Sequence, residues 1–360
     1  MMHNTIIGFG SIFHKQAIDG IENTSNAHFL GAHELFYAGR YAIKYVIHGI
    51  LEHQHINAIW IPNYYCPFVK NWLEQEFESI TYYDIDPFDA TSKIDWSLFT
   101  ANDIVIANNY WGLKEHQIPN GERPIVIEDH SHGWLSKGCM DSQADFCIAS
   151  LRKTLPIPLG GIAWKPVKSK CSIPLKPLEK NNIAIETNPM LQSWALIDSA
   201  METKATCNKE EEKSVFLQQY SQGEVLLRNT QEIVPLLAEH ETVIRNALFK
   251  DFNAYKKTHL AYILQAIHPS QAFKIINEES KTPFGLLLAF KERELFKDFK
   301  QFLITHMIYP AELWPQNNIA QDYKFLVNIH IDFRYNTKDL EFMADTINRW
   351  TLQRSSLQIE

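Results

Sequence analysis

The chain has 360 residues, enough for two domains or for one large domain with a smaller companion. Hydrophobic residues make up 45% and charged residues 21%, which excludes a disordered chain, a collagen-like repeat and a coiled coil. With 34 Lys and Arg against 42 Asp and Glu, the formal charge is −8, so no general attraction to nucleic acid or to an anionic membrane is expected.

The sequence also gives only weak signals for a cellular compartment or for insertion into a membrane. The longest apolar run, 284–290, is far shorter than the roughly 20 residues of a membrane-spanning helix, so no membrane span is expected. The N-terminal segment has neither a basic start nor a long apolar stretch and does not predict a secretory signal. The five cysteines form no CxxC pair, which disfavours disulfides and a zinc site and indicates a cytoplasmic protein.

Short apolar strands separated by helical or loop segments fill the first half of the sequence. One helix is predicted after Gly39 and another over 68–77. Strands are predicted at 58–62, 80–83, 103–107, 124–127, 145–149 and 161–164. This alternation is typical of an α/β domain with a doubly wound, mostly parallel sheet, in which ligands bind beyond the carboxyl ends of the strands.

The second half changes character after a proline-rich stretch. Residues 190–249 are predicted to be mostly helical, with a kink or boundary at Pro235. The C-terminal third indicates an α+β unit with strands at 284–290 and 329–333, a helix at 295–306 and a last helix from Asn336 or Thr337. We therefore predict a large α/β domain over residues 1–235 and a small α+β domain over 236–360.

Three segments combine reactive side chains with predicted strand ends or a helix start. Segment 125–132 is a strand that runs into acidic and imidazole groups, and 149–154 is a strand that ends in a hydroxyl and two cations. Segment 37–42 has a glycine that opens a helix, whose free N–H groups can hold a phosphate. A phosphate, an acidic partner and a reactive amine are the needs of pyridoxal phosphate (PLP).

The order of these residues carries a family resemblance. Asp129 is followed three positions later by His132 and 24 residues later by Lys153, with Ser150 just upstream of the lysine. In this the chain resembles the PLP-dependent aspartate-aminotransferase superfamily (fold type I), and within it a divergent branch of the DegT/DnrJ/StrS-type aminotransferases. The resemblance covers roughly residues 30–165 well and the C-terminal third in outline. It implies the PLP transferase fold and a homodimer.

The resemblance implies roles for three residues at the reacting centre. Lys153 would form the Schiff base with PLP and then shuttle a proton. Asp129 would pair with the pyridine nitrogen and keep it protonated. His132 would contact the phenolic oxygen of the ring or help to place the cofactor.

Further roles follow for the periphery of the site. Gly39, Arg40 and Ser150 would bind the phosphate, Tyr65 would stack on the ring, and Arg334 would bind a substrate carboxylate through its planar fork. The chain departs from the family pattern at two places. Residues 39–43 read Gly-Arg-Tyr-Ala-Ile where the family commonly has Gly-Thr-x-Ala-Leu, and the serine precedes the lysine by three positions where the family usually has five.

Each assignment has an ordinary structural alternative. Lys153 could be a surface lysine, Asp129 a turn cap and His132 a hydrogen-bonded structural histidine. In the same way Tyr65 could belong to the core, and Arg334 could form a salt bridge with the nearby Asp332. The pair His130-x-His132 invites a metal interpretation, but no further ligand cluster accompanies it in the sequence, so no metal is predicted.

The predicted function is transamination. An amino acid such as glutamate would donate an amino group to a keto acceptor, for which a nucleotide-linked keto-sugar of polysaccharide biosynthesis is one candidate. Two alternatives stay open: another PLP-dependent reaction such as a lyase or decarboxylase, and a non-catalytic protein that retains the fold.

Overall fold

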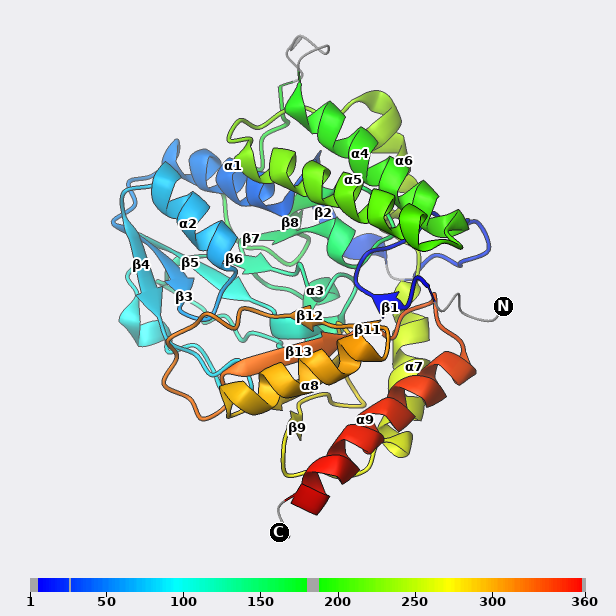
Figure 1. The fold of residues 1–360 in the computed structure, drawn as a ribbon. Helices are drawn as coiled ribbons and strands as arrows, with labels where there is room; N and C mark the ends of the chain where they lie inside the picture. The colour runs from blue at the N-terminus through cyan, green and yellow to red at the C-terminus, as the bar shows by residue number, and fades with distance from the viewer. Residues whose placement is uncertain (1–5, 26, 180–187, 358–360) are drawn as a thin grey trace.

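The computed structural model describes residues 6–25, 27–179 and 188–357, and two separate sheets organise it (Figure 1). The larger sheet has seven strands in the order β2-β8-β7-β6-β5-β3-β4. Its strands are β2 (Leu30–Phe36), β3 (Ala58–Pro62), β4 (Ile80–Tyr83), β5 (Asp103–Asn108), β6 (Ile125–Asp129), β7 (Phe146–Ala149) and β8 (Gly161–Pro166). Every neighbouring pair from β7 to β4 is parallel, and only β8 pairs antiparallel with its neighbours β7 and β2. The α/β class and the mostly parallel large sheet predicted from the sequence are confirmed.

The strands at the centre of this sheet form because their side chains are apolar on both faces. All residues of β5, β6 and β7 are buried, as expected for parallel strands covered on both sides. One cover is α1 (Gly39–Leu51), which buries Ile43, Ile47 and Ile50 against the sheet. A second helix, α2 (Pro67–Glu76), begins at a proline and follows β3.

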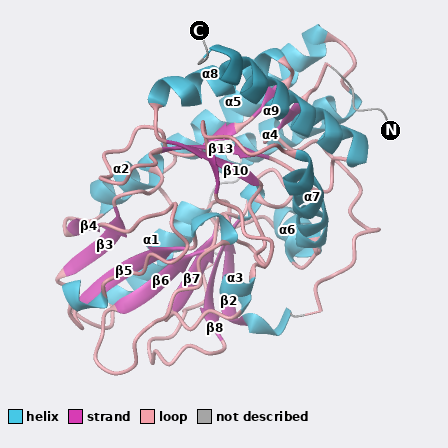
Figure 2. Cartoon of the chain, turned by 90° about the horizontal axis from the view of Figure 1, so that it is seen from below, coloured by secondary structure: helices cyan, strands magenta, loops and turns pink. Residues whose placement is uncertain are grey.

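The smaller sheet belongs to the C-terminal third and has the order β12-β13-β10-β9. Its strands are β9 (Lys274–Ile275), β10 (Leu286–Phe290), β12 (Ala311–Glu312) and β13 (Phe325–Ile329). The N-terminal β1 (Phe9–Gly10) pairs with β11 (Ile308–Tyr309) beside it. Helices α8 (Arg293–Thr305) and α9 (Thr337–Leu357) pack here around a second core that contains Phe299, Met343 and Trp350. Figure 2 shows β3 to β8 as one layer and β10 with β13 as a separate group.

The prediction of a strand at 329–333 was wrong. The strand β13 ends at Ile329, because the residues that pair with β10 are Phe325 to Ile329. Residues 330–333 follow the strand as irregular chain, although His330 and Asp332 are buried. The alternation of apolar and polar residues over 329–333 was read from the sequence as strand pairing, yet residues 329–332 are all buried in the structure, polar ones included.

The short helix α3 (Lys137–Met140) lies between β6 and β7 of the large sheet. The chain from the large to the smaller sheet forms the helices α4 (Pro189–Thr206), α5 (Glu210–Asn229), α6 (Ala238–Leu248) and α7 (Phe252–Ala266). The pair α4 and α5 packs closely at Gly223, where a Cβ atom would lie 2.6 Å from Ile197 Cγ1. The domain division at residue 235 stays a prediction, and α6, which follows it, places Ile244 and Leu248 in the core of the large sheet.

Two global properties concern the described residues. None of their helices combines the length and the apolar character needed to cross a bilayer. All five cysteines are free thiols in this part of the chain.

Candidate active site

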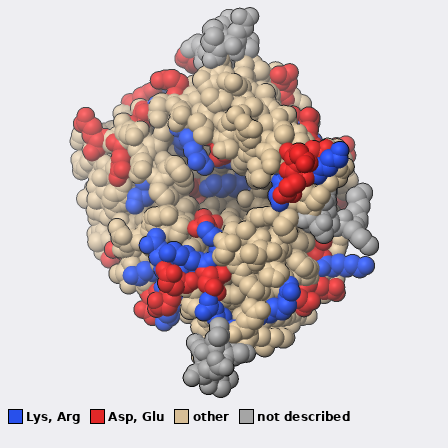
Figure 3. All heavy atoms as spheres, in the orientation of Figure 1, with Lys and Arg blue, Asp and Glu red and all other residues tan. Residues whose placement is uncertain are grey.

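A cavity of about 300 Å³ lies beyond the carboxyl ends of β5, β6 and β7. Its walls come from the large sheet, the start of α1, one face of α5 and the smaller sheet. Figure 3 shows a hollow near the middle of one face of the molecule, with Lys or Arg atoms inside it. Seven residues predicted from the sequence line this cavity, and they are Gly39, Arg40, Tyr65, Asp129, His132, Ser150 and Lys153.

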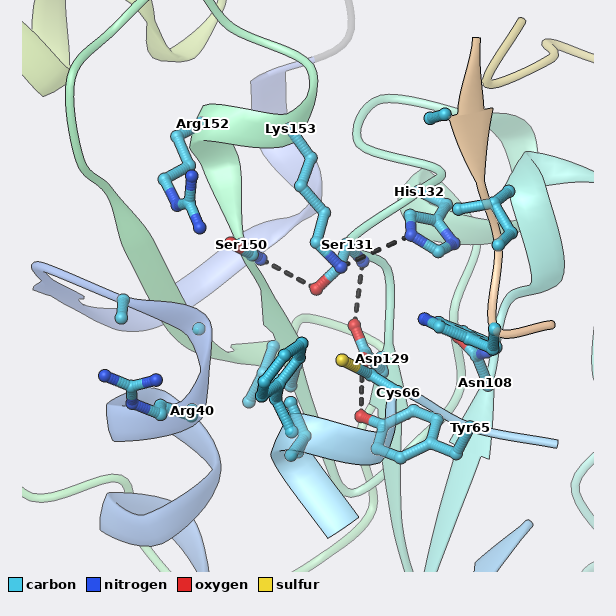
Figure 4. A pocket seen from close by; sticks show the side chains of 18 of the residues that line it. Arg40, Tyr65, Cys66, Asn108, Asp129, Ser131, His132, Ser150, Arg152 and Lys153 are labelled. Atoms are coloured by element: carbon cyan, nitrogen blue, oxygen red, sulfur yellow. Dashed lines mark hydrogen bonds between the residues drawn. The ribbon is translucent and has the colours of Figure 1, made fainter. Parts of the chain in front are cut away.

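Asp129, the last residue of β6, is the acidic centre of the cavity (Figure 4). Its Oδ1 accepts a hydrogen bond of 2.8 Å from the Ser131 amide, and its Oδ2 accepts one from the Tyr65 hydroxyl. Burial, together with the neighbouring carboxylate, raises the pKa of Tyr65 well above its ordinary value, so the phenol stays protonated and donates. The Tyr65 hydroxyl therefore points at the acid, and its role as a ring-stacking residue stays a prediction.

Lys153 ends the 3-10 turn Leu151–Lys153 that follows β7. Its Nζ lies 3.3 Å from Nε2 of His132, and the two side chains point toward one another in Figure 4. Burial, and to a lesser extent the lysine, lowers the pKa of His132 well below its ordinary value. The neutral imidazole accepts the hydrogen bond from Lys153. Its ring lies between Phe284 and Trp314, at centroid distances of 4.6 and 5.4 Å.

The start of α1 forms a further part of the cavity wall. Gly39 abuts Ser150 so closely that a Cβ atom would lie 2.9 Å from the Ser150 Cβ and 3.0 Å from its amide nitrogen. The Ser150 amide donates to Ser131 Oγ at 2.8 Å. Beside them, Nε and Nη2 of Arg40 are buried without a hydrogen-bond partner in the described chain. A helix N-terminus beside two unpaired guanidinium nitrogens is suited to an anion such as a phosphate.

One face of α5 closes the cavity with a charge cluster that the sequence did not indicate. Glu224 forms ion pairs with Arg152 at 2.6 Å and with Arg228 at 3.3 Å. Tyr220, one turn earlier, lies 3.4 Å from Arg152. The spacing of these α5 residues predicts a shared helix face, but nothing local in the sequence predicts what that face covers.

The structure does not bring Arg334 to the cavity. Its guanidinium is buried and forms a two-pronged ion pair with Asp332, with both contacts at 2.7 Å. It also donates to the Ile12 carbonyl at 2.8 Å. The salt bridge named as the ordinary alternative is what the structure contains, because Asp332 lies within reach two residues earlier.

A second cluster lies behind the cavity, on the other face of β6. Ligand atoms of Glu128, His130 and Cys147 lie within 4.8 Å of one another, a grouping that the sequence did not reveal. Glu128 accepts hydrogen bonds from Ser142 and, at 3.1 Å, from His130, whose other ring nitrogen lies 3.0 Å from Asn109 Nδ2. These groups satisfy one another, so we interpret them as a buried hydrogen-bond network that supports the end of β6.

No protein-family model and no curated protein matches this sequence. Solved structures do match. A putative sugar aminotransferase from Streptococcus pneumoniae in its PMP form is 11% identical, with a TM-score of 0.58 over 95% of this chain and 94% of that chain. The chain has the fold of this enzyme. The fold predicted from the sequence, a large mostly parallel sheet domain with a smaller C-terminal α+β unit, is thereby confirmed.

Two further structures agree with this fold. The sugar aminotransferase CalS13 from Micromonospora echinospora is 11% identical, with a TM-score of 0.54 over 88% of this chain and 87% of that chain. The 3-amino-5-hydroxybenzoic acid synthase is also 11% identical, with a TM-score of 0.57 over 91% of this chain and 88% of that chain. The match spans nearly the whole chain, so it includes the C-terminal third, where the sequence resemblance was only an outline.

Several residues of the cavity were not predicted from the sequence. Asn108 ends β5, Phe284 precedes β10, Trp314 follows β12, and His330 follows β13. Asn108 occupies a strand end next to the predicted sites, so its position was a usable signal. The others reach the cavity only because the smaller sheet faces the larger one, and no spacing in the sequence encodes that approach.

Proposed function

We propose that this protein is a PLP-dependent aminotransferase that moves an amino group from an amino acid donor, such as glutamate, to a keto acceptor. The observation that carries the proposal is that Lys153 and Asp129, which follow adjacent parallel strands, line one cavity with an anion-binding helix start at its end. A keto-sugar, free or nucleotide-linked, is the proposed acceptor class, since enzymes named as sugar aminotransferases share the fold.

The residues present fit the cofactor. The pyridine nitrogen would pair with Asp129, whose oxygens each have one hydrogen bond from the protein and a lone pair left over. The phosphate would lie at the start of α1 beside the unpaired nitrogens of Arg40, where the missing Cβ of Gly39 lets the helix start approach Ser150 closely. When bound, PLP supplies an electron sink that stabilises a carbanion at the substrate.

The protein's own side chains would carry out the proton transfers. Lys153 would attach the cofactor and, when released, hold and move a proton at Nζ. The neutral His132 orients that amine through the 3.3 Å contact and does not compete with it for the proton. The buried Asp129 would pair with the ring nitrogen and keep it protonated.

A substrate carboxylate needs a cation that can be reached from solvent. Arg334 is engaged with Asp332, so we propose Arg228 for this role. Its side chain is 45% exposed at the cavity margin, and its contact with Glu224 is 3.3 Å, longer than that of Arg152. A planar guanidinium at this position matches a carboxylate in two-pronged geometry.

The proposal retains the cytoplasmic homodimer predicted from the sequence. Phe68 lines the cavity, yet it is 58% exposed, with the Arg228 guanidinium 4.4 Å from its ring. A second copy of the chain over this margin would bury the phenyl ring and complete the wall. Light scattering of the purified protein tests this, and a monomer with full activity would contradict it.

The decisive experiment is the visible absorption of wild type, Lys153→Ala and Lys168→Ala with added PLP. Lys168 is an exposed lysine paired with Asp141, so it serves as the control. We expect a protein-bound cofactor band in wild type and in the control and none in Lys153→Ala. Borohydride should fix the cofactor to the peptide that contains Lys153, as read by mass spectrometry.

The same preparation separates the alternatives. Amino acid donors should bleach the band and keto acceptors should restore it, whereas a lyase or decarboxylase would release products without needing an acceptor. Absence of any band in wild type with excess PLP would overturn the proposal and favour a non-catalytic protein with this fold.

A further inference from the structure

His330 contributes an unsatisfied polar atom to the cavity. It follows β13, is buried and belongs to the cavity lining. Its Nε2 is enclosed without a hydrogen-bond partner among the described residues. Leaving such an atom unpaired is energetically costly, so a buried nitrogen beside a cavity indicates a partner that the cavity receives.

The other side of the His330 ring is fixed by charged groups. Its Nδ1 lies 3.7 Å from Asp332 Oδ2, and Asp332 is held in turn by the fork of Arg334. The edge of the ring meets Phe284 at a centroid distance of 5.4 Å and an angle of 72°. These contacts leave the imidazole little freedom to rotate.

The protonation state follows from this setting. Burial lowers the pKa of His330 to about 3, while Asp332 raises it and the cations Arg334, Lys256 and Lys204 lower it further, so the ring is neutral near pH 7. A neutral imidazole carries one proton, and the carboxylate beside Nδ1 attracts that proton. Nε2 is therefore a buried lone-pair acceptor on a residue that lines the cavity.

We infer that His330 is a specificity-determining residue whose Nε2 accepts a hydrogen bond from a hydroxyl or ammonium group of the substrate. The inference rests on the proposed function, because it assumes that a substrate enters beside Lys153. The inference also assigns a role in substrate binding to the smaller sheet, which contributes neither Lys153 nor Asp129. A carboxylate or phosphate has only lone pairs to offer at this position and is disfavoured there.

The test compares two amines that differ only in hydroxyl groups. Cyclohexylamine and an aminodeoxyinositol are titrated into the PLP-loaded protein, and binding is followed by the change of the visible cofactor band. The proteins are wild type, His330→Gln, which keeps an acceptor near the position of Nε2, and His330→Leu, which removes it. Unfolding in urea and the unperturbed band report whether each variant is folded and loaded.

We expect wild type to bind the hydroxylated amine about three- to tenfold more tightly, the effect of one hydrogen bond. His330→Gln should keep most of that preference, and His330→Leu should lose it with the band intact. Equal preference in His330→Leu and wild type, or no preference in wild type, would overturn the role of His330. A missing band in wild type would instead overturn the proposed function.

A second measurement observes the wild-type ring directly. Nitrogen-15 NMR of histidine-labelled, PLP-loaded wild type reports the tautomer of each ring, with His330→Gln used for assignment. We expect an unprotonated Nε2 at His330 that shifts when the aminodeoxyinositol is added. A proton on Nε2 in the loaded protein would contradict the inference.

Discussion

The carboxylate of Asp129 is held by two donors, the Tyr65 hydroxyl and the Ser131 amide. Both contacts hold the carboxylate in place at the cavity, where a pyridine nitrogen would meet its remaining lone pairs. The sequence placed Tyr65 in the site through its segment, but it could not tell a stacking ring from a hydroxyl that reaches an acid. That difference depends on the side-chain direction set by the turn before α2.

Lys204 gives a prediction about pH. It lies on α4, is buried and donates to the Ile12 carbonyl, and burial followed by the Arg334 charge lowers its pKa to about 7. In the unfolded chain the ordinary value is about 10.5, so between these values the unfolded state binds the extra proton. The free energy of unfolding contributed by this site therefore rises with pH across that window.

The variant Lys204→Met should lack this contribution. The Ile12 carbonyl keeps its hydrogen bond from Arg334 at 2.8 Å, so the substitution does not leave it unpaired. Urea unfolding of both proteins at about pH 7 and about pH 9 should show wild type gaining stability relative to the variant. Equal changes in the two proteins would mean that Lys204 stays protonated in the fold.

At the scale of elements, most strands of the large sheet were predictable and the edge strand β2 was not. The strands β3, β5, β6 and β7 match their apolar runs closely, because burial on both faces favours such runs. The other edge strand, β4, is mostly only partly buried but matches its β-branched and aromatic run at Ile80–Tyr83. By contrast, β2 lies at the edge of the sheet, and most of its residues are only partly buried or exposed. Its sequence, which includes His33 and Glu34, has no continuous apolar run, so no strand was predicted there.

At the scale of elements, the testable prediction concerns the start of α1. In Gly39→Ala the new Cβ would meet Ser150 backbone and Cβ atoms at 2.9–3.0 Å, so the helix start must move away from the strand end. Since phosphate affinity depends on that placement, PLP affinity should fall about tenfold or more. Titration of the visible band measures the loss.

The same helix supplies the control. Gly49 also lies in α1, and nothing approaches the position of its Cβ within 4 Å. Gly49→Ala should bind PLP like wild type and gain about 0.5–1 kcal/mol in unfolding free energy from the better helix former. If both variants lose the cofactor equally, the helix as a whole and not its first residue supports the phosphate.

At the scale of the molecule, the cavity depends on segments that are distant in sequence. Asp129 comes from the large sheet, Glu224 from α5 and His330 from the smaller sheet. The sequence predicted the site residues at the strand ends of the large sheet, such as Asp129, because strand-end motifs are local and their spacing is regular. It could not predict the other two, since their place in the cavity follows only from how α5 and the second sheet pack on the first.

The link between α5 and the turn of Lys153 gives the last prediction. Glu224 is largely buried and forms the 2.6 Å ion pair with Arg152, the residue before Lys153. Glu224→Gln keeps the shape but removes the charge, so the unfolding free energy should fall by about 1.5–3 kcal/mol, as for other hydrogen bonds to charged groups. The control Glu202→Gln removes the same charge from an exposed 3.1 Å pair with Lys15 and should cost less than about 1 kcal/mol.

Hydrogen exchange should become faster in α5 and at residues 151–153 in Glu224→Gln alone, because that ion pair holds the helix against the turn. Unchanged exchange would show that apolar packing of α5 suffices to close the cavity.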